Sequence, residues 1–488
     1  MTRTLDLRHV VSPAVRDLIE LVNLDNFDRV REQVEHLGGC TEPVRLVGHT
    51  TTVDTGTGEV LRSYSTADEP TGHLLTPCGN RRASRCPSCS RLYAADTFHL
   101  IRAGLCGGKS VPVTVRTHPR VFATLTAPSF GPVHNRPIRK GALRPCRCGK
   151  LHDDADALLG TPLNPKTYDY PGAVLFNAHA GALWARFTIY LRRELAALLG
   201  MTQKAMHTVL RVSFAKVAEY QKRGLVHFHA VIRLDGPEGS DTPPPAEATA
   251  SVLTAAIKAA ARRVVLAVNS DAVGDREIVW GEQVDVRTIA AFGTDAKLTD
   301  HAVAAYVAKY ATKSADDSGT LDRSLFCTPC QGRGMAPSAQ TGVPVECRAC
   351  SGTGQSRPLP RLAVERHVRQ MIRTCWDLGQ RPEFADLKLW KWAHMLGFRG
   401  HFSTKSRRYS ITLGQLRDAR RTWRTEQARA RADLPDLDPT TTLVVSRWAY
   451  YGSGYSPGEE LLAAAERHAR EVERELRAQF KHEGEEWA

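Results

Sequence analysis

Two histidines two residues apart form the first group that could do chemistry. His227 and His229 lie in residues 225–234 (LVHFHAVIRL), an apolar and β-branched run that predicts a β-strand. Because neighbouring side chains of a strand point to opposite faces, both imidazoles project from one face, where they can converge on a single cation. The alternative is an ordinary surface or core histidine pair, since this spacing alone carries little information.

Glu219 can complete a metal site with these histidines. It precedes His227 by eight residues, and the KRG sequence at residues 222–224 predicts the turn of a β-hairpin between them. In that hairpin Glu219 would lie opposite the pair, with Gln221 on the same face as a substitute ligand. Two imidazoles and a carboxylate suit a divalent ion that keeps positions open for a phosphate oxygen, so Mg²⁺ or Mn²⁺ is the expected catalytic cofactor.

Two tyrosines form a second candidate group. Residues 300–313 (DHAVAAYVAKYATK) predict a capped helix with Tyr306 and Tyr310 one turn apart on one face. Phenol is a poor nucleophile near neutral pH because its unperturbed pKa is about 10, and an ammonium group from Lys309 or Lys313 would favour the phenolate. The alternative is a plain buried stripe of tyrosines and valines.

Two CxxC pairs predict a structural zinc site. The first pair is Cys327 and Cys330, the second is Cys347 and Cys350, and 16 residues separate them. A glycine-rich knuckle follows each pair (CQGRG and CSGTG). Four thiolates at this spacing favour tetrahedral Zn²⁺.

Cysteines near the N-terminus predict a second structural zinc. Cys78, Cys86 and Cys89 (CGNRRASRCPSC) provide three ligands, and Cys40 is the natural fourth.

A third zinc site is indicated by the CRCGKLH segment, with His134 as a conceivable partner. Its ligands would be Cys146, Cys148 and His152. The C-x-C spacing is a less usual pair for zinc. Cys106 and Cys375 are expected to be buried thiols.

Length and composition bound the class of protein. The chain has 488 residues and 66 Lys+Arg against 52 Asp+Glu, a formal charge of +14, and that length predicts two to four domains. Hydrophobic content of 42% and charged content of 24% exclude global disorder. We find no membrane-length apolar run and no signal-peptide core, so we expect a cytoplasmic protein without a membrane partner. Its 12 cysteines should then be thiols or metal ligands rather than disulfides.

The basic excess is concentrated in one segment. Residues 361–425 contain 15 Lys+Arg and 5 Asp+Glu, a net charge of +10, which resembles a phosphate-contacting surface. The DNA-binding residues predicted within it are Arg399, Lys405, Arg407 and Arg408. Its aromatic residues could stack on unpaired bases, although most are expected to be ordinary core.

An α+β fold must position these groups. We predict strands at residues 118–127, 207–221, 225–234 and 279–289, and helices at residues 249–267, 299–313 and 456–481. Residues 236–248 form a Pro/Gly-rich linker. A hairpin in place of a regular βαβ repeat favours an antiparallel β-sheet flanked by helices.

Three ordered motifs resemble those of HUH endonucleases. They are FATLTAPS at residues 122–129, AEYQKRGLVHFHAVI at residues 218–232 and YVAKYATK at residues 306–313. More narrowly, the chain resembles rolling-circle replication initiators of actinobacterial plasmids and integrative conjugative elements. This resemblance spans residues 38–410 and includes GGC, CGNRR, CPSC, AGLCGGKSVP and GFRGHFSTKSRRYS.

The resemblance implies an HUH fold and a metal-dependent nicking and joining enzyme that acts on origin DNA, single-stranded at the nick site. A tyrosine would attack a phosphodiester, leaving a 5′-phosphotyrosine and a free 3′-hydroxyl that primes synthesis. By this resemblance His227 and His229 are the HUH metal ligands and Glu219 is the third ligand. Tyr306 and Tyr310 occupy the nucleophile positions.

One position departs from the plasmid pattern. Many plasmid initiators have a glutamate four residues before the catalytic tyrosine, where this chain has Tyr306. The YVAKY sequence is similar to bacteriophage initiators, in which two tyrosines take turns, so we predict Tyr310 as the first nucleophile and Tyr306 as its partner. The sequence has no GxxxxGK[ST] phosphate loop. A host helicase and a DNA polymerase are therefore expected partners.

Five segments follow from these assignments. They are an N-terminal zinc-binding region (1–110), an HUH nickase domain (111–320), a zinc-knuckle insertion (321–356), a basic DNA-binding region (357–440) and a C-terminal charged helix (441–488). Two other functions stay open. A non-enzymatic, zinc-containing DNA-binding regulator would explain the cysteines and the charge, and a conjugative relaxase would share the fold and the chemistry.

Overall fold

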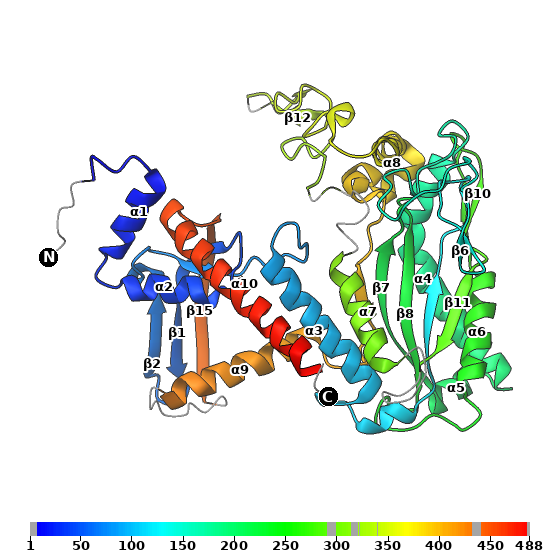
Figure 1. Ribbon diagram of the computed structural model, residues 1–488, viewed down its shortest axis with the longest axis horizontal. Coiled ribbons are helices and arrows are strands. Elements are labelled where there is room, and N and C mark those ends of the chain that lie inside the picture. Colours follow the sequence, from blue (N-terminus) through cyan, green and yellow to red (C-terminus); the bar gives the residue numbers. More distant parts are fainter. Residues whose placement is uncertain are drawn as a thin grey trace. The chain divides into compact units, whose positions relative to one another are not determined.

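The computed structural model describes residues 7–289, 299–313, 321, 323–338, 340–431 and 441–485. The chain divides into two compact units, one of residues 1–95 and 414–488 and the other of residues 96–413. Each unit combines helices with an antiparallel sheet, which confirms the predicted α+β class (Figure 1). Among the described helices, none combines the length and the apolar character that a membrane crossing requires.

The first unit joins the two ends of the chain. Its central strand, β1 (Val44–Asp54), pairs antiparallel with β2 (Val60–Ser65), β3 (Leu74–Thr76) and β15 (Thr442–Ser453). The C-terminal helix α10 (Pro457–Glu485) packs against α1 (Pro13–Val22) and α2 (Phe27–His36).

This pairing corrects two predicted segments. Residues 441–488 are not only a charged helix, because they begin with strand β15 and share a unit with the N-terminal region. The basic region 357–440 is also not one body, because the boundary between the units falls within it at residue 414. The sequence lacked a signal for this division because the paired strands are almost 400 residues apart.

The second unit is built on a five-stranded antiparallel sheet in the order β11-β4-β8-β7-β14. Its strands are β4 (Arg120–Leu125), β7 (Arg211–Tyr220), β8 (Val226–Asp235), β11 (Val284–Thr288) and β14 (Ser403–Lys405). β7 and β8 form the predicted hairpin. β7 starts later than predicted because residues before it form the helix α5 (Gln203–Val209), which the Thr202 side chain caps through the Ala205 N–H.

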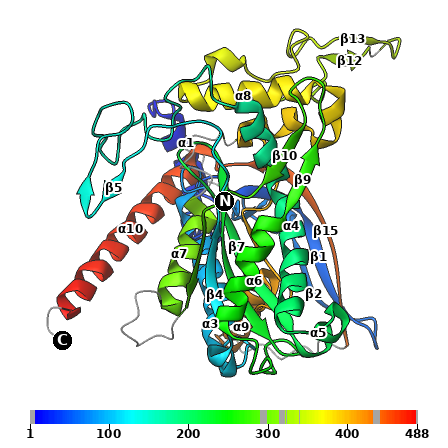
Figure 2. The same ribbon diagram turned by 90° about the vertical axis from the view of Figure 1, so that its right-hand side faces the viewer.

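Helices cover the two faces of this sheet differently (Figures 1 and 2). α4 (Tyr170–Leu198) and α6 (Ala250–Arg263) cover one face, where Phe228 of β8 meets Trp184 of α4 with ring centroids 5.7 Å apart. Most of the buried core lies between these layers. α7 (Asp300–Lys313), the predicted tyrosine helix, lies on the opposite face against β7.

The remaining elements connect and extend these layers. They are α3 (Pro87–Cys106), β5 (Ile138–Arg139), β6 (Ala142–Leu143), β9 (Val265–Val268), β10 (Arg276–Val279), β12 (Met335–Pro337), β13 (Pro344–Glu346), α8 (Arg366–Gly379) and α9 (Leu413–Arg431), with 3-10 helices at Thr66–Asp68, Val113–Thr117, Leu359–Arg361, Pro382–Leu387 and Leu389–Met395. The predicted strand at 279–289 is shorter in the structure, where β11 covers Val284–Thr288 and only Val279 of the predicted range belongs to β10. The predicted linker at 236–248 connects β8 to α6.

Most aromatic residues of the basic segment are core, as expected. Trp376, Phe398 and Tyr409 are buried, whereas Trp423 on α9 is 60% exposed. Trp423 is thus the one among these four that could stack on a base.

Candidate active site: a metal centre beside two tyrosines

The β7–β8 hairpin brings the predicted metal ligands together. Glu219 is paired directly with His227 across the two strands, and Val217 is paired with His229. The three polar side chains share the sheet face that α7 covers, because His229 also meets Tyr306 of that helix. The sequence pattern therefore predicted both the hairpin and the face.

The donor atoms converge at distances that suit a cation. Glu219 Oε2 lies 2.9 Å from His227 Nε2 and 2.8 Å from His229 Nε2, and the two Nε2 atoms are 3.1 Å apart. Neighbouring ligands of an octahedral ion with bonds of about 2.1 Å would be about 3.0 Å apart. Two imidazole nitrogens and one carboxylate oxygen therefore fit three adjacent positions of Mg²⁺ or Mn²⁺, with the other positions left for water or substrate.

A second shell of contacts orients His229. Thr124 of β4 is paired with His229 across the sheet, and its Oγ1 lies 3.0 Å from His229 Nδ1. The Phe122 ring stacks on the imidazole with an interplanar angle of 3°. A hydrogen bond at Nδ1 fixes which tautomer the ring adopts and leaves Nε2 for a metal. Thr124 was not predicted as a site residue, although it lies in the FATLTAPS motif.

The electrostatics of the site favour an ionised Glu219 carboxylate beside a neutral His229 imidazole. Burial raises the pKa of Glu219, but hydrogen bonds from His227 and His229 outweigh it and lower that pKa to about 2. Burial lowers the pKa of His229 despite the neighbouring carboxylate. Neutral imidazole and ionised carboxylate are the forms that bind metals.

The two tyrosines of α7 face this group. The Tyr306 hydroxyl lies 3.1 Å from His229 Nε2, the same spacing that separates the metal donors. The Tyr306 and Tyr310 rings are 4.4 Å apart, and the Tyr310 ring lies 6.0 Å from the His229 ring. Burial, reinforced by the charge of Glu219, raises the pKa of Tyr306. Both phenols thus lie beside one cluster of donor atoms. They are therefore not simply part of a buried stripe of tyrosines and valines.

Of the two lysines predicted to act on α7, the structure describes the side chain of Lys309 only. Lys309 is exposed, with Nζ 5.6 Å from the centroid of the Tyr310 ring. Lys313 ends the helix, but its side chain lies outside the described residues.

A buried amide fixes the turn between Glu219 and His227. Asn177 of α4 has no exposed surface, and its Nδ2 donates to the carbonyls of Gly224 and Leu396 at 2.9 Å each. Its Oδ1 accepts the N–H of Val226 at 3.0 Å. Sequence reasoning missed this residue, because an asparagine within an otherwise apolar helix gives no sign of its partner.

The turn also explains why Gln221 is not placed as a ligand. Its Oε1 accepts a hydrogen bond from Arg223 Nε at 2.7 Å. Arg223 in turn donates to the carbonyls of Ala127 and Pro128 at the end of β4. Gln221 therefore contributes to the turn.

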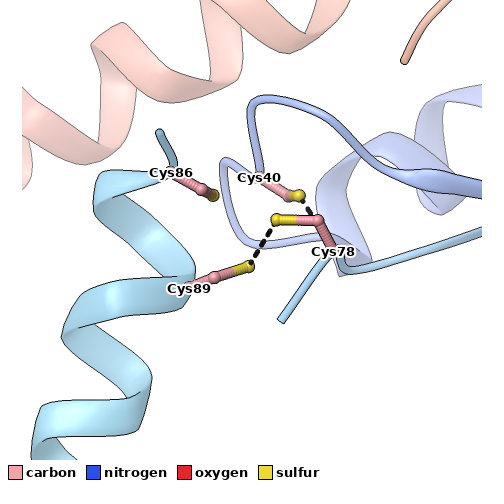
Figure 3. A group of neighbouring side chains, drawn as sticks. All are labelled: Cys40, Cys78, Cys86 and Cys89. Carbon is pink, nitrogen blue, oxygen red and sulfur yellow. Dashed lines mark hydrogen bonds between the residues drawn. The ribbon is translucent and has the colours of Figure 1, made fainter. Parts of the chain in front are cut away.

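The four N-terminal cysteines form a site that can hold a metal ion such as zinc (Figure 3). Their sulfur atoms point toward one another, with 3.7 Å between the Cys78 and Cys89 sulfurs. Sulfurs on a tetrahedral zinc with bonds of about 2.3 Å would be about 3.8 Å apart. Backbone N–H groups of Cys78 and Thr41 donate to the sulfurs of Cys40 and Cys86, as expected for thiolates.

The CxxC pairs form a second such site. The sulfurs of Cys327 and Cys347 are 3.8 Å apart, and those of Cys330 and Cys350 are 3.7 Å apart. These distances again match a zinc tetrahedron and far exceed a disulfide bond of about 2.05 Å.

A third group has mixed ligands. His134, Cys146, Cys148 and His152 offer ligand atoms that lie within 4.8 Å of one another. His134, which the sequence suggested only as a partner, thus belongs to the group. Cys106 and Cys375 are buried outside these groups, as predicted.

The predicted DNA-binding residues lie in several settings. Lys405 is half-buried on β14, its Nζ donates to the carbonyl of Ser410, and burial lowers its pKa to about 8. Arg407 and Arg408 line a cavity of about 450 Å³. Arg399 donates to the carbonyl of Asp386. Lys405 is therefore less available to a phosphate than the three arginines.

Comparisons with known proteins agree on one family. The family model for RepSA, the replication initiator protein of pSAM2, matches residues 26–468. A replication initiator protein from Streptomyces ambofaciens is 50% identical over 453 residues, which cover 92% of this chain and 91% of that protein. No solved structure matches the chain.

Proposed function

The chain belongs to the RepSA family of replication initiator proteins, and we propose that it starts rolling-circle replication by nicking one origin strand with a tyrosine of an HUH endonuclease site. Membership of the family implies origin DNA as the partner. The proposal adds the chemistry, the residues and the fold that perform it.

The observation that carries the proposal is the contact between α7 and the metal donors. The Tyr306 hydroxyl lies 3.1 Å from His229 Nε2, within a cluster where Glu219 Oε2 lies 2.8 Å from the same nitrogen. A DNA-binding regulator needs no phenol beside a metal-binding triad. A nickase needs this arrangement, because the nucleophile must reach a phosphate held by the metal.

The reaction is a transesterification. A tyrosine oxygen bonds to the scissile phosphorus as the bond from phosphorus to the 3′ oxygen breaks. The phenol loses its proton, and the departing 3′ oxygen gains one and becomes a 3′-hydroxyl. One phosphate ester replaces another, so the phosphotyrosine conserves the bond for later rejoining without ATP.

His227, His229 and Glu219 would hold a divalent ion, which supplies Lewis-acid polarisation of the phosphate. Thr124 and Phe122 fix the orientation of His229. Lys309 lies close to the Tyr310 ring and so brings a positive charge near this phenol.

Two phenols within one site support alternating use. We propose that Tyr310 makes the first nick and that Tyr306 resolves the junction formed after one round of synthesis. Their ring separation of 4.4 Å lets either oxygen approach one phosphate after a small movement of DNA. A host helicase and polymerase would unwind and extend the nicked strand, and Arg399, Arg407 and Arg408 would contact its phosphates.

The experiment is covalent capture of DNA. Wild-type protein, incubated with single-stranded origin DNA and Mn²⁺, should form an adduct that survives denaturing electrophoresis. Tyr310→Phe should reduce the first adduct strongly, Tyr306→Phe should reduce it less, and the double variant should form none. Tyr190→Phe is the matched control, because Tyr190 belongs to α4, on the face of the sheet opposite α7. Binding by the wild type without any adduct would instead identify a non-enzymatic regulator.

A further inference from the structure

A basic hairpin in the second unit has no role in the proposed chemistry. Residues 135–150, here called the basic finger, contain β5 and β6, which pair Ile138 with Leu143 and Arg139 with Ala142. Figure 2 shows β5 projecting away from the sheet. Lys140 and Gly141 between the strands both have positive φ, +52° and +76°, which makes a tight hairpin turn.

Most of the positive charge of the finger has no acidic partner among the described residues. It contains six Lys+Arg and no Asp+Glu. Arg136 pairs with Asp154 at 2.7 Å. The other five are exposed, and their side chains make no hydrogen bond or ion pair within the described part of the chain; they are Arg139, Lys140, Arg144, Arg147 and Lys150.

The tip of the finger also exposes apolar surface. The paired residues Ile138 and Leu143 are 61% and 36% exposed, although they face each other across the strands. Basic side chains thus flank a small apolar pair. A two-stranded ribbon of this kind fits the major groove of duplex DNA, where apolar side chains can contact thymine methyl groups.

The base of the finger is a metal-ligand group. The Cys148 sulfur lies 3.2 Å from His152 Nε2, and His134 Nδ1 lies 3.4 Å from the same atom. Two nitrogens on a tetrahedral zinc would be about 3.4 Å apart. His152 Nδ1 lies 2.6 Å from Asp156 Oδ2, the carboxylate contact that commonly orients a zinc-bound histidine.

This base is attached to the turn of the catalytic hairpin. Lys222 Nζ donates to the carbonyl of Asp154 at 2.7 Å, and a Cβ on Gly160 would lie only 2.4 Å from the Lys222 carbonyl carbon. Glu219 is three residues before Lys222, so the attachment lies about 10 Å along the strand from the metal donors. DNA held by the finger would therefore be close to the site of nicking.

We infer that the basic finger is a zinc-anchored clamp for duplex DNA next to the nick site. We assign duplex DNA as the ligand for two reasons. The finger has no aromatic residue on which unpaired bases could stack, and its basic two-stranded ribbon can contact phosphates and fit into the major groove. The inference depends on the proposed function in one respect, because the nick site is the site that the proposed function assigns.

The test compares two triple variants of the full chain. Arg139→Gln, Arg144→Gln and Arg147→Gln remove three charges from the finger. Lys204→Gln, Lys258→Gln and Arg262→Gln remove three exposed charges from α5 and α6 as a matched control. Fluorescence anisotropy would measure binding of a random-sequence DNA duplex and of single-stranded oligothymidine over a range of salt concentrations.

The finger variant should weaken duplex binding by about 100-fold at about 0.15 M salt and reduce the salt slope by about 2.7, because each phosphate contact contributes about 0.9. The control should change both much less. An equal loss for both variants, or an equal loss on oligothymidine, would overturn the inference.

Two further measurements separate this inference from the proposed function and test the anchor. Adduct formation on single-stranded origin DNA should be unchanged in the finger variant, since the finger contains no catalytic residue. If wild type forms no adduct but the finger variant still loses duplex binding, the proposed function fails and the inference stands. Cys148→Ser should remove one zinc equivalent and weaken duplex binding as well, and zinc loss with full duplex affinity would refute the anchoring role.

Discussion

Replacing Thr124 with valine should weaken binding of Mn²⁺ to the proposed site of Glu219, His227 and His229 without removing any ligand. The Thr124 Oγ1 lies 3.0 Å from His229 Nδ1. When Nε2 binds a metal, the ring proton must be on Nδ1, and the threonine hydroxyl is then its acceptor. Valine keeps the β-branched shape, so β4 should retain its packing.

The expected loss of Mn²⁺ affinity follows from comparing His229 without metal and with metal. Without metal, His229 can hold its proton on Nε2 and donate it to Glu219, which leaves Nδ1 with no buried proton to satisfy. With metal, the valine variant leaves a buried N–H unpaired, which costs about 1–3 kcal/mol. The dissociation constant for Mn²⁺ should therefore rise about 10- to 100-fold, the range typical of outer-shell changes at metal sites.

The assay is calorimetric titration of Mn²⁺ into zinc-loaded protein, with adduct formation on single-stranded DNA as a second readout. Thr126→Val is the matched control, because Thr126 directly follows the same strand but its hydroxyl donates to the carbonyl of Gln283. The Thr124 variant should recover adduct formation at high Mn²⁺ concentration. Equal Mn²⁺ affinity for the two variants would show that the Thr124 contact does not orient the ligand.

Three other groups offer tests outside the proposed metal site. Cys330→Ser should contain one zinc equivalent less than the wild type, measured by elemental analysis, and should melt at a lower temperature. Cys375→Ala is the control and should keep all its zinc; equal zinc contents in the two variants would contradict the CxxC site. Burial lowers the pKa of Lys216 to about 8, and an unfolded lysine titrates near 10.4, so the unfolded chain binds the extra proton and wild-type stability should rise between these pH values. Lys216→Met should abolish that rise in urea unfolding, and an unchanged rise would assign it to other groups. Burial raises the pKa of Glu459, but the neighbouring His73, whose Nε2 lies 3.3 Å from its Oε1, and the hydrogen bond from the Ser456 N–H outweigh it and depress the pKa. The stabilisation by Glu459 is therefore present above about pH 4.3 and is lost as pH falls. Glu459→Gln should flatten this loss in acid unfolding, and an acid limb identical to wild type would argue against it.

Local rules were enough to predict much of the site. Strand alternation placed His227 and His229 on one face, and a short turn placed Glu219 opposite them. Helical spacing placed the two tyrosines on one face of α7. Ligand spacing predicted both cysteine tetrads, because CxxC pairs grip zinc through their local geometry.

Long-range pairing could not be predicted in the same way. β15 pairs with β1 along most of its length, for example at Val44 and Ser453, and the sequence of neither strand indicates its partner. The partners of buried polar groups were equally hidden, as for Asn177, whose three hydrogen bonds reach two distant segments. The start of β7 was predicted too early because the cap at Thr202 favours a helix over the strand propensity of the residues after it.

The geometry of the site depends on the register between β7 and β8, and several contacts at the turn between these strands hold that register. A shift of one residue between β7 and β8 would direct both imidazoles to the face of α4 and would bring Phe228 against α7. Asn177 opposes such a shift because it binds the backbone on both sides of the turn, at Gly224 and Val226. Arg223, within the turn, opposes it by donating to the carbonyl of Ala127 just beyond the end of β4. Lys222 opposes it by donating to the carbonyl of Asp154, next to the base of the basic finger. The proposed metal donors are thus positioned by groups that are not themselves ligands.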